Sequence, residues 1–201
     1  MTVWETHPVN PQKRNLDQVA YALNRGEVII LPTDTVYALT AKANCHEAVL
    51  RIYRLKNLPE NKPLALYCVN FGQAAQFIRM DNNQVYRYVK RIIPGPYTLV
   101  FTASKNLPAY TLTKQKTVGI RIVDHPVVKG LLERLDFPLI GTSVVLEDPY
   151  LAYPEEIEDK YGKLVDGFVN CGPIPLEYST ILDCRAYPPV LLRQGKGVFV
   201  G

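Results

Sequence analysis

Apolar positions recur along the chain at two spacings, and each spacing predicts one kind of element. Leu16, Val19 and Leu23 lie at helical spacing, and they predict a helix that begins after a cap at Asn15 and ends at Gly26. The same spacing predicts helices over residues 49–56, 72–78, 83–92, 127–135 and 155–161. Short apolar runs predict strands over residues 27–31, 64–69, 97–102, 117–123, 139–146, 164–169, 180–184 and 189–193.

Helices alternate with strands in this pattern, but without strict strand–helix–strand regularity. The order predicts an α/β (α+β) fold with one large, twisted, mixed sheet flanked by helices. The chain has 201 residues, of which 47% are hydrophobic and 21% charged, a composition that excludes a disordered chain. Because no repeat, low-complexity segment or long linker interrupts the pattern, we expect a single domain over residues 1–201.

Neither a membrane segment nor a metal site is evident. The longest apolar runs, such as residues 28–31, are far shorter than the roughly 20 residues of a membrane span. Charged residues such as Glu5 and Lys13 interrupt the N-terminal segment, which therefore does not resemble a signal peptide. The four cysteines form no CxxC pair, and the three histidines show no ligand spacing with them. We expect free thiols, no protein-bound metal and a cytoplasmic location.

Charge is unevenly distributed along the chain, although the formal net charge is only +4. Residues 84–134 carry nine Lys and Arg against two acids, whereas residues 147–166 carry seven acids against two lysines. The basic block could attract a polyanion, either a nucleotide or RNA. Solvated helix faces explain the same counts at least as well, so both interpretations stay open.

Hydroxyl and basic side chains stand at several strand ends. In Pro32–Leu39 (PTDTVYAL), Thr33 and Thr35 follow a predicted strand directly, at the edge of a sheet where open α/β folds bind ligands. An ordinary turn, with Asp34 hydrogen-bonded to the backbone, explains this segment better when it is taken alone. Lys56 and Lys62 flank a second turn, where a lysine at a helix end also complements the helix dipole.

Arg121 lies on an otherwise apolar predicted strand, TVGIR. A buried guanidinium without a partner is costly, so Arg121 requires an anionic partner or a cavity, and both alternatives remain open. Two further hydroxyl-bearing turns, Gly141-Thr142-Ser143 and Ser179-Thr180, stand beside predicted strands.

Together, in this order and at these distances, six segments resemble the YrdC/YciO family of threonylcarbamoyl-AMP synthase-like proteins. The matching segments are PTDTVYAL, RLKNLPENKPLAL, PGPYTLVF, TVGIRIVDHP, GTSVV and STILDC, and the resemblance covers about residues 7–199. It implies a YrdC-like twisted mixed sheet with a large basic concave face. In catalytic members the cavity takes L-threonine, bicarbonate and ATP. The carbamate formed from threonine attacks the α-phosphate, pyrophosphate leaves, and threonylcarbamoyl-AMP goes on to threonylcarbamoyladenosine (t6A) in tRNA.

The resemblance also implies roles for individual residues. Thr33 and Arg121 would contact threonine, with Thr35 and Thr142 on the same substrate side, and Lys56 and Arg121 would be the catalytic pair. The nucleotide side would be lined by Lys56, Lys62, Thr117, Ser143, Ser179 and Arg193. Magnesium would accompany the triphosphate, and no tightly bound cofactor is implied.

Three departures distinguish this chain from catalytic members. The Lys-x-Arg motif of those members ends here in Leu58, their Ser-x-Asn motif ends in Val145, and the glycine after PTDTVY is Ala38. These changes resemble the YciO-like branch, and Val145 falls late in the apolar strand predicted over residues 139–146.

Two functions therefore remain open. Loss of one preorganised donor typically costs about 10²–10³ in rate. The first hypothesis is a nucleotidyltransferase, a threonylcarbamoyl-AMP synthase of reduced or altered activity. The alternative is a non-catalytic protein that binds nucleotide, double-stranded RNA or tRNA with the same basic cavity.

Overall fold

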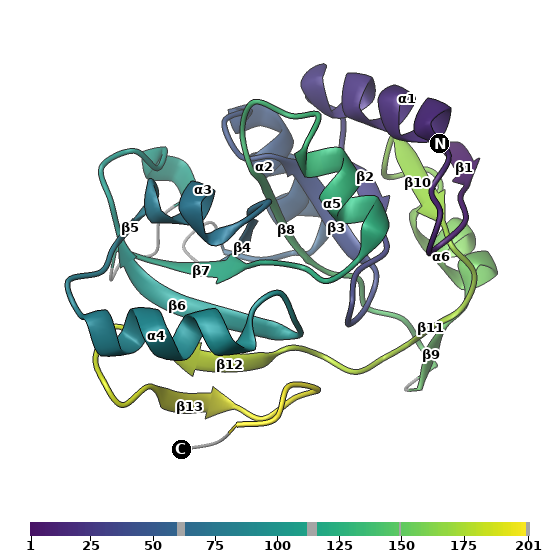
Figure 1. Cartoon of the computed structure of the whole chain (residues 1–201). Helices are drawn as coiled ribbons and strands as arrows, with labels where there is room; N and C mark the ends of the chain where they lie inside the picture. Colours follow the sequence, from purple (N-terminus) through teal and green to yellow (C-terminus); the bar gives the residue numbers. More distant parts are fainter. Residues whose placement is uncertain (60–62, 112–115, 149, 200–201) are drawn as a thin grey trace.

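One twisted sheet forms the body of the protein (Figure 1). The computed structural model describes residues 1–59, 63–111, 116–148 and 150–199. Among these residues, eleven strands join the sheet: β1 (Thr2–Glu5), β2 (Ile29–Leu31), β3 (Ala38–Lys42), β4 (Ala65–Tyr67), β5 (Ile78–Arg79), β6 (Tyr97–Ala103), β7 (Thr117–Arg121), β8 (Leu139–Ser143), β10 (Gly167–Asn170), β12 (Thr180–Asp183) and β13 (Val190–Arg193). Their spatial order is β1-β10-β2-β3-β8-β4-β7-β6-β12-β13, with β5 paired to β6, and the pairing is mixed parallel and antiparallel. The predicted fold class is confirmed.

The helices lie at the periodic segments, with shifts at their ends. They are α1 (Lys13–Asn24), α2 (His46–Leu55), α3 (Phe71–Ala75), α4 (Asn83–Ile92), α5 (Pro126–Leu132) and α6 (Pro154–Tyr161), with a short 3-10 helix at Ala109–Thr111. Gly26, at φ 84°, lies just after α1, in the left-handed region that favours glycine. No helix in the described part of the chain is long and apolar enough to cross a membrane.

Several predicted boundaries are wrong for identifiable reasons. Asn15 does not cap α1, because the helix starts earlier and the side-chain Nδ2 of Asn15 donates to the carbonyl of Glu5 at 2.8 Å. The helix predicted over residues 72–78 ends at Ala75, since Ile78 pairs with Ala103 as part of β5. Strands β1 and β3 were not predicted, and neither was the small sheet of β9 (Leu151–Ala152) and β11 (Ile174–Pro175).

Side-chain alternation along the strands separates two apolar clusters. Helices α1 and α5 pack in one cluster with inward residues of β2 and β3, such as Ile29. Helices α2, α3, α4 and α6 pack in the other cluster with strand residues that point to the opposite face of the sheet, such as Ile30 and Phe101. On β7, Val118 and Ile120 join this second cluster together with α4. The opposite side of β7 is therefore turned away from α4, and this side carries the site.

Candidate ligand-binding cavity

A cavity of about 500 Å³ lies on the side of β6, β7 and β12 opposite to α4. This volume is within the range of small-molecule sites, about 300–1,000 Å³. Six residues predicted for the site line it: Thr117, Arg121, Thr142, Ser143, Ser179 and Arg193. Strand pairing brings them together, since β7 pairs with β6 and β6 pairs with β12.

Arg121 satisfies both alternatives that its sequence left open. Its guanidinium forms an ion pair with Asp34, both side chains being less than one tenth exposed, and Nη1 donates to Thr35 Oγ1 at 2.9 Å. It also lies 5.6 Å from the centre of the Tyr67 ring and lines the cavity. Among the described residues, Arg121 Nε is the one buried side-chain polar atom without a hydrogen-bond partner. The arginine is thus held rigidly at the site, and its unpaired Nε is enclosed by protein.

Thr33 and Thr35 form the turn that positions this ion pair. Thr33 Oγ1 donates to the carbonyl of Val36 at 2.6 Å and accepts from the Val36 amide at 3.1 Å. Its hydroxyl also lies 2.9 Å from Thr35 Oγ1, which accepts from Arg121. Both threonines are buried and neither lines the cavity. Their contact with substrate stays a prediction, and the role visible in the structure is to orient Arg121.

Ser179, just before β12, and Arg193, the last residue of β13, form a second polar group. Arg193 Nη2 donates to the Ser179 carbonyl at 2.8 Å, and Ser179 Oγ lies 2.8 Å from Thr98 Oγ1. Burial lowers the pKa of Arg193, and the positive charge of Arg121 lowers it further. The two guanidinium groups therefore act on the same space, which an anionic ligand would stabilise.

Lys56 reaches the same strand end from α2. It follows the last residue of the helix, and its Nζ donates to the carbonyl of Ser143 at 2.8 Å. Lys56 is therefore next to a lining residue of the cavity without being a lining residue itself. Lys62, the other predicted lysine, lies outside the described residues.

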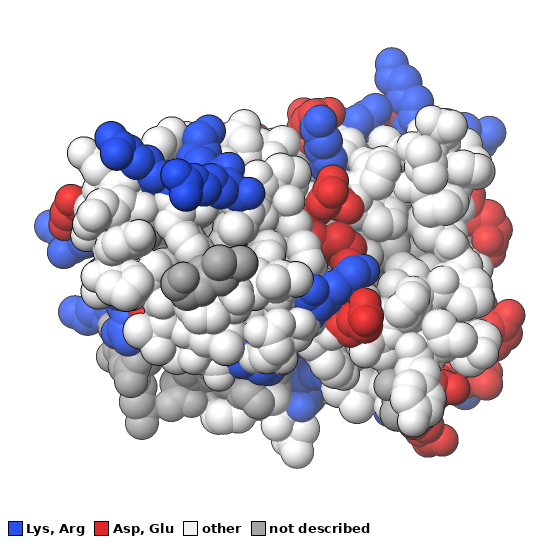
Figure 2. All heavy atoms as spheres, turned by 60° about the horizontal axis from the view of Figure 1, so that its bottom comes forward, with Lys and Arg blue, Asp and Glu red and all other residues white. Residues whose placement is uncertain are grey.

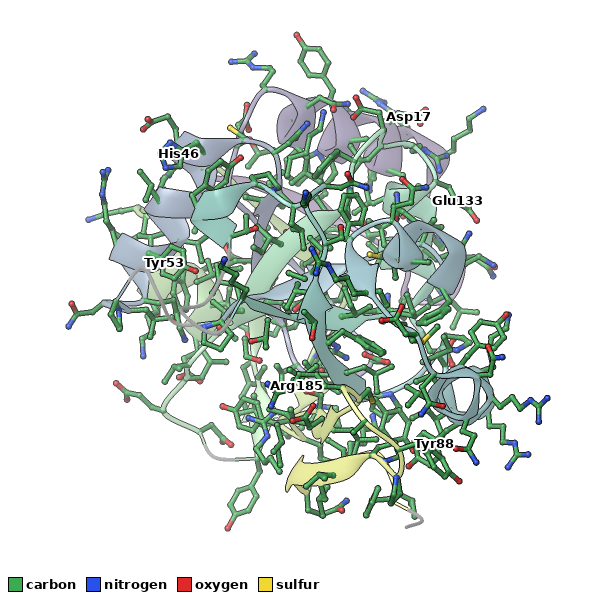
Figure 3. The ribbon with its side chains drawn as sticks, turned by 90° about the vertical axis from the view of Figure 1, so that its left-hand side faces the viewer. Asp17, His46, Tyr53, Tyr88, Glu133 and Arg185 are labelled. Atoms are coloured by element: carbon green, nitrogen blue, oxygen red, sulfur yellow. The ribbon has the colours of Figure 1, made fainter. Side chains whose placement is uncertain are left out.

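Asp34 and three polar lining residues, Thr98, Asp183 and Arg185, were not predicted for the site from the sequence. Asp34 was interpreted as a turn residue, and its Oδ2 does accept from the Asp124 amide at 3.1 Å, yet Oδ1 pairs with Arg121. Thr98, Asp183 and Arg185 line the cavity, and Arg185 Nη2 donates to Asp183 Oδ2 at 2.6 Å. Figure 3 labels Arg185 beside the C-terminal strands. Of these residues, only Asp34 could have been inferred from the sequence. It is an acid in a candidate ligand-binding turn, and Arg121 was known to require an anionic partner or a cavity.

The structure corrects the predicted location of Val145, one of the residues that differ from catalytic family members. Strand β8 ends at Ser143, so Val145 lies beyond it with 50% of its surface exposed, rather than within an apolar strand. Its backbone amide donates to the Tyr161 hydroxyl at 3.1 Å. Leu58 is half-buried against the core. Neither Leu58 nor Val145 lines the cavity.

The described basic residues of the block over residues 84–134 do not form one surface. Arg87, Lys90 and Arg91 belong to α4, whereas Arg121 is buried on the opposite side of β7. Figure 2 shows Lys and Arg gathered over α4 at the upper left, and elsewhere in that view they alternate with acids and uncharged surface. The local positive charge is therefore divided between the two faces of the sheet.

Comparison with known proteins identifies the family. The family model Sua5_yciO_yrdC, described as telomere recombination, matches residues 21–195. The chain belongs to the Sua5/YciO/YrdC family. The family resemblance predicted from the six segments is thereby confirmed.

Relatives of two kinds share this fold. YciO of Escherichia coli K12 is 34% identical over 194 residues, covering 95% of this chain and 94% of YciO. The crystal structure of E. coli YciO matches with a TM-score of 0.91 over 98% of both chains. A threonylcarbamoyl-AMP synthase of Vibrio vulnificus is 31% identical over 187 residues, 90% of this chain and 98% of the synthase. Pyrococcus abyssi Sua5 complexed with L-threonine matches at 25% identity and a TM-score of 0.88, over 97% of this chain and 58% of Sua5.

Proposed function

We propose that the cavity binds ATP and L-threonine and that the chain forms threonylcarbamoyl-AMP, more slowly than members of its family with complete motifs. The observation that carries this proposal is the convergence of Arg121, Arg193 and five serine and threonine side chains on one cavity. A planar guanidinium suits a carboxylate, and a second cation with short hydroxyl donors suits phosphate oxygens. The kinship with threonylcarbamoyl-AMP synthases supports the same assignment.

The reaction balances with bicarbonate as the third substrate. The threonine amine adds to bicarbonate with loss of water, and the resulting carbamate oxygen attacks the α-phosphate of ATP, so that pyrophosphate leaves. Arg121 would hold the threonine carboxylate, while Arg193, Lys56 and Ser179 would stabilise charge on the phosphates. Donors held in place before the reaction need no reorganisation as charge develops, and this is why a rigid Arg121 is useful.

The residues present suit magnesium that arrives with ATP. The two carboxylates at the site, Asp34 and Asp183, are each paired with an arginine. In the described part of the chain, no group of three His, Cys, Asp or Glu side chains could hold a metal ion. Phosphate oxygens and water would therefore be the main ligands of the ion, which is usual for Mg²⁺. When bound, it would neutralise phosphate charge.

The test is a discriminating assay of the purified chain with ATP, L-threonine and bicarbonate. We expect pyrophosphate release that depends on all three substrates, and a product with the mass of threonylcarbamoyl-AMP. Omission of bicarbonate and replacement of L-threonine by L-valine are the controls. Nucleotide binding without pyrophosphate release would favour the non-catalytic alternative. No ATP binding at millimolar concentration would reject both the synthase and a nucleotide-binding role, and would leave RNA binding as the alternative.

The link to tRNA needs a separate measurement. If the product feeds t6A formation, the chain should restore t6A in cells that lack their own synthase. If the chain is catalytically active but fails in this complementation, the proposed reaction stands and its proposed link to t6A formation is rejected.

A further inference from the structure

A second cavity lies between α3 and α5, the helices that follow the neighbouring strands β4 and β7. These two helices pack in different apolar clusters. Strands β4 and β7 are parallel neighbours, with Tyr67 opposite Arg121. Strand β4 leads into α3, which packs in the cluster that contains α4, whereas β7 leads into α5, which packs in the cluster of α1. In α/β sheets such a divergence opens a crevice outside the carboxyl ends of the strands, and ligands commonly bind there.

This crevice is a cavity of about 730 Å³ that shares no lining residue with the candidate synthase site. It is lined by residues 68–71 after β4, residues 122–126 after β7, the end of α4 and one side of α5. Figure 3 shows the separation: Glu133, which lines the crevice, is at the upper right, and Arg185 of the synthase site is at the lower centre. The crevice is therefore a distinct candidate site.

Two lining side chains have their acceptors occupied and their donors available. Asn70 Oδ1 accepts from the Gln73 amide at 2.9 Å, as the cap of α3. His125 Nδ1 accepts from the Val127 amide at 3.3 Å, which places the proton of the neutral ring on Nε2. Burial lowers the pKa of His125. Neither Asn70 Nδ2 nor His125 Nε2 has an acceptor among the described residues. Both present N–H donors to a ligand that accepts hydrogen bonds.

The charged and apolar side chains that line the crevice limit further the classes of ligand that fit it. Lys90 from α4 and Lys129 from α5 line the crevice, and so do the exposed acids Asp124 and Glu133. Equal numbers of cations and anions disfavour a polyanion such as a nucleotide, and they are compatible with a ligand that carries at most one negative charge. The remaining wall is apolar, formed by residues such as Phe71, Ile93 and Leu132.

We propose that this crevice binds a small organic carboxylate with an apolar body. Its carboxylate would accept from Asn70 and His125 and lie near the two lysines, and its apolar body would lie against the hydrophobic wall. A free carboxylic acid and an apolar amino acid share this chemistry. They differ in the ammonium group, for which Asp124 and Glu133 are the available partners.

Three probes that share a 3-methylbutyl group test the proposal on the intact chain by calorimetry: sodium 4-methylpentanoate, L-leucine and 3-methylbutylamine. We expect the two carboxylates to bind at millimolar concentration or below and the amine not to bind. Tighter binding of L-leucine than of 4-methylpentanoate would identify an amino acid as the ligand, and the reverse would identify a free acid. No carboxylate binding, or equal binding of the amine, would overturn the proposal.

A matched pair of substitutions locates the bound probe. Asn70→Asp keeps the oxygen that caps α3 but replaces the amide donor with a negative oxygen, so the affinity for 4-methylpentanoate should fall about tenfold or more. Asn82→Asp makes the same change at the cap of α4, away from the crevice, and should leave the affinity unchanged. Equal affinity in both variants would overturn the assignment.

Two further measurements keep the result decisive. If Asn70→Asp does not fold, Lys129→Gln removes an exposed cation from the crevice and should weaken binding several-fold; unchanged affinity would contradict the proposal. Saturating ATP should not displace 4-methylpentanoate, because the two cavities share no lining residue. Displacement would place the probe in the synthase site instead. Carboxylate binding does not depend on synthase activity, so either proposal can fail without the other.

Discussion

The two ends of the sheet are covered differently, and the uncovered face carries the candidate site. Around β2 and β3, helices pack on both faces, with Leu131 of α5 on one side and Ile52 of α2 on the other, each fully buried. Around β6, β7 and β12, α4 packs on one face and the other is the floor of the cavity. The same chain thus builds a closed core and an open polar face from one continuous sheet.

The difference is visible in the composition of the strands. Strand β2 reads Ile-Ile-Leu and is buried on both sides, so every position is apolar. Strand β7 reads Thr-Val-Gly-Ile-Arg and alternates, with Val118 and Ile120 in the core and Thr117 and Arg121 at the cavity. On β7 the polar side chains all lie on the same face of the strand, and yet they are buried. Such a face indicates a ligand site rather than a solvent-exposed surface.

The largest effect is expected where the open face holds a buried charge. Asp34→Ala leaves Arg121 without its anionic partner, and breaking such a buried ion pair costs about 3–5 kcal/mol of unfolding free energy. Urea denaturation measures the loss. Asp34→Ala combined with Arg121→Met should recover part of it, because no uncompensated charge remains. A loss below about 1 kcal/mol in the single variant, as for a surface pair, would show that water solvates this arginine.

Two neighbouring residues on β12 compare the faces directly. Leu182 is fully buried in the core cluster, so Leu182→Ala should cost about 2–5 kcal/mol. Ile181 lines the cavity, where solvent or ligand already replaces part of its packing, so Ile181→Ala should cost clearly less. Equal losses in thermal unfolding would mean that the cavity is as closed as the core.

Restoring the two missing donors should raise synthase activity. In the double variant Leu58→Arg with Val145→Asn, each correctly placed donor could contribute about 1.5–3 kcal/mol to the transition state. Since Val145 is half-exposed, the asparagine amide stays hydrated and little stability is lost. The measurement is the initial rate of threonylcarbamoyl-AMP formation, with melting temperature as the control. A folded variant that binds ATP without any gain would show that the site has diverged at other positions.

The smallest effect concerns His125, at the boundary between the two ends. Burial lowers the pKa of His125 below its ordinary value of 6.5, against the opposing charges of Asp34 and Asp124. The unfolded chain therefore binds the proton first, and the free energy of unfolding falls as the pH drops through 6.5 toward the lower folded value. His125→Asn keeps a capping acceptor and removes this titration. The stability of the parent relative to the variant should decrease from about pH 7.5 to about pH 5.5; a constant difference would exclude the burial effect.

Elements that depend on local spacing were predictable from the sequence. Helix α4 spans the predicted residues, Asn83–Ile92, because its apolar face and the following Pro94 are local signals. Strand β1 was not predictable, since Thr2 pairs with Gly167 across most of the chain. The same limit applies to the site. The residue types and their order indicated the family, but the hydrogen bonds of Thr33 within its own turn became visible only in the folded chain.

Local pattern was sufficient for the mixed α/β class, for most helices and strands, and for the requirement that Arg121 find an anion or a cavity. It could not show that Asp34 is that anion, that Val145 is exposed, or that α4 and the cavity lie on opposite sides of β7. The physical reason is that periodicity depends on neighbours within a few residues. A sheet brings together strands that are distant in sequence, and their pairing decides which face is packed and which stays open.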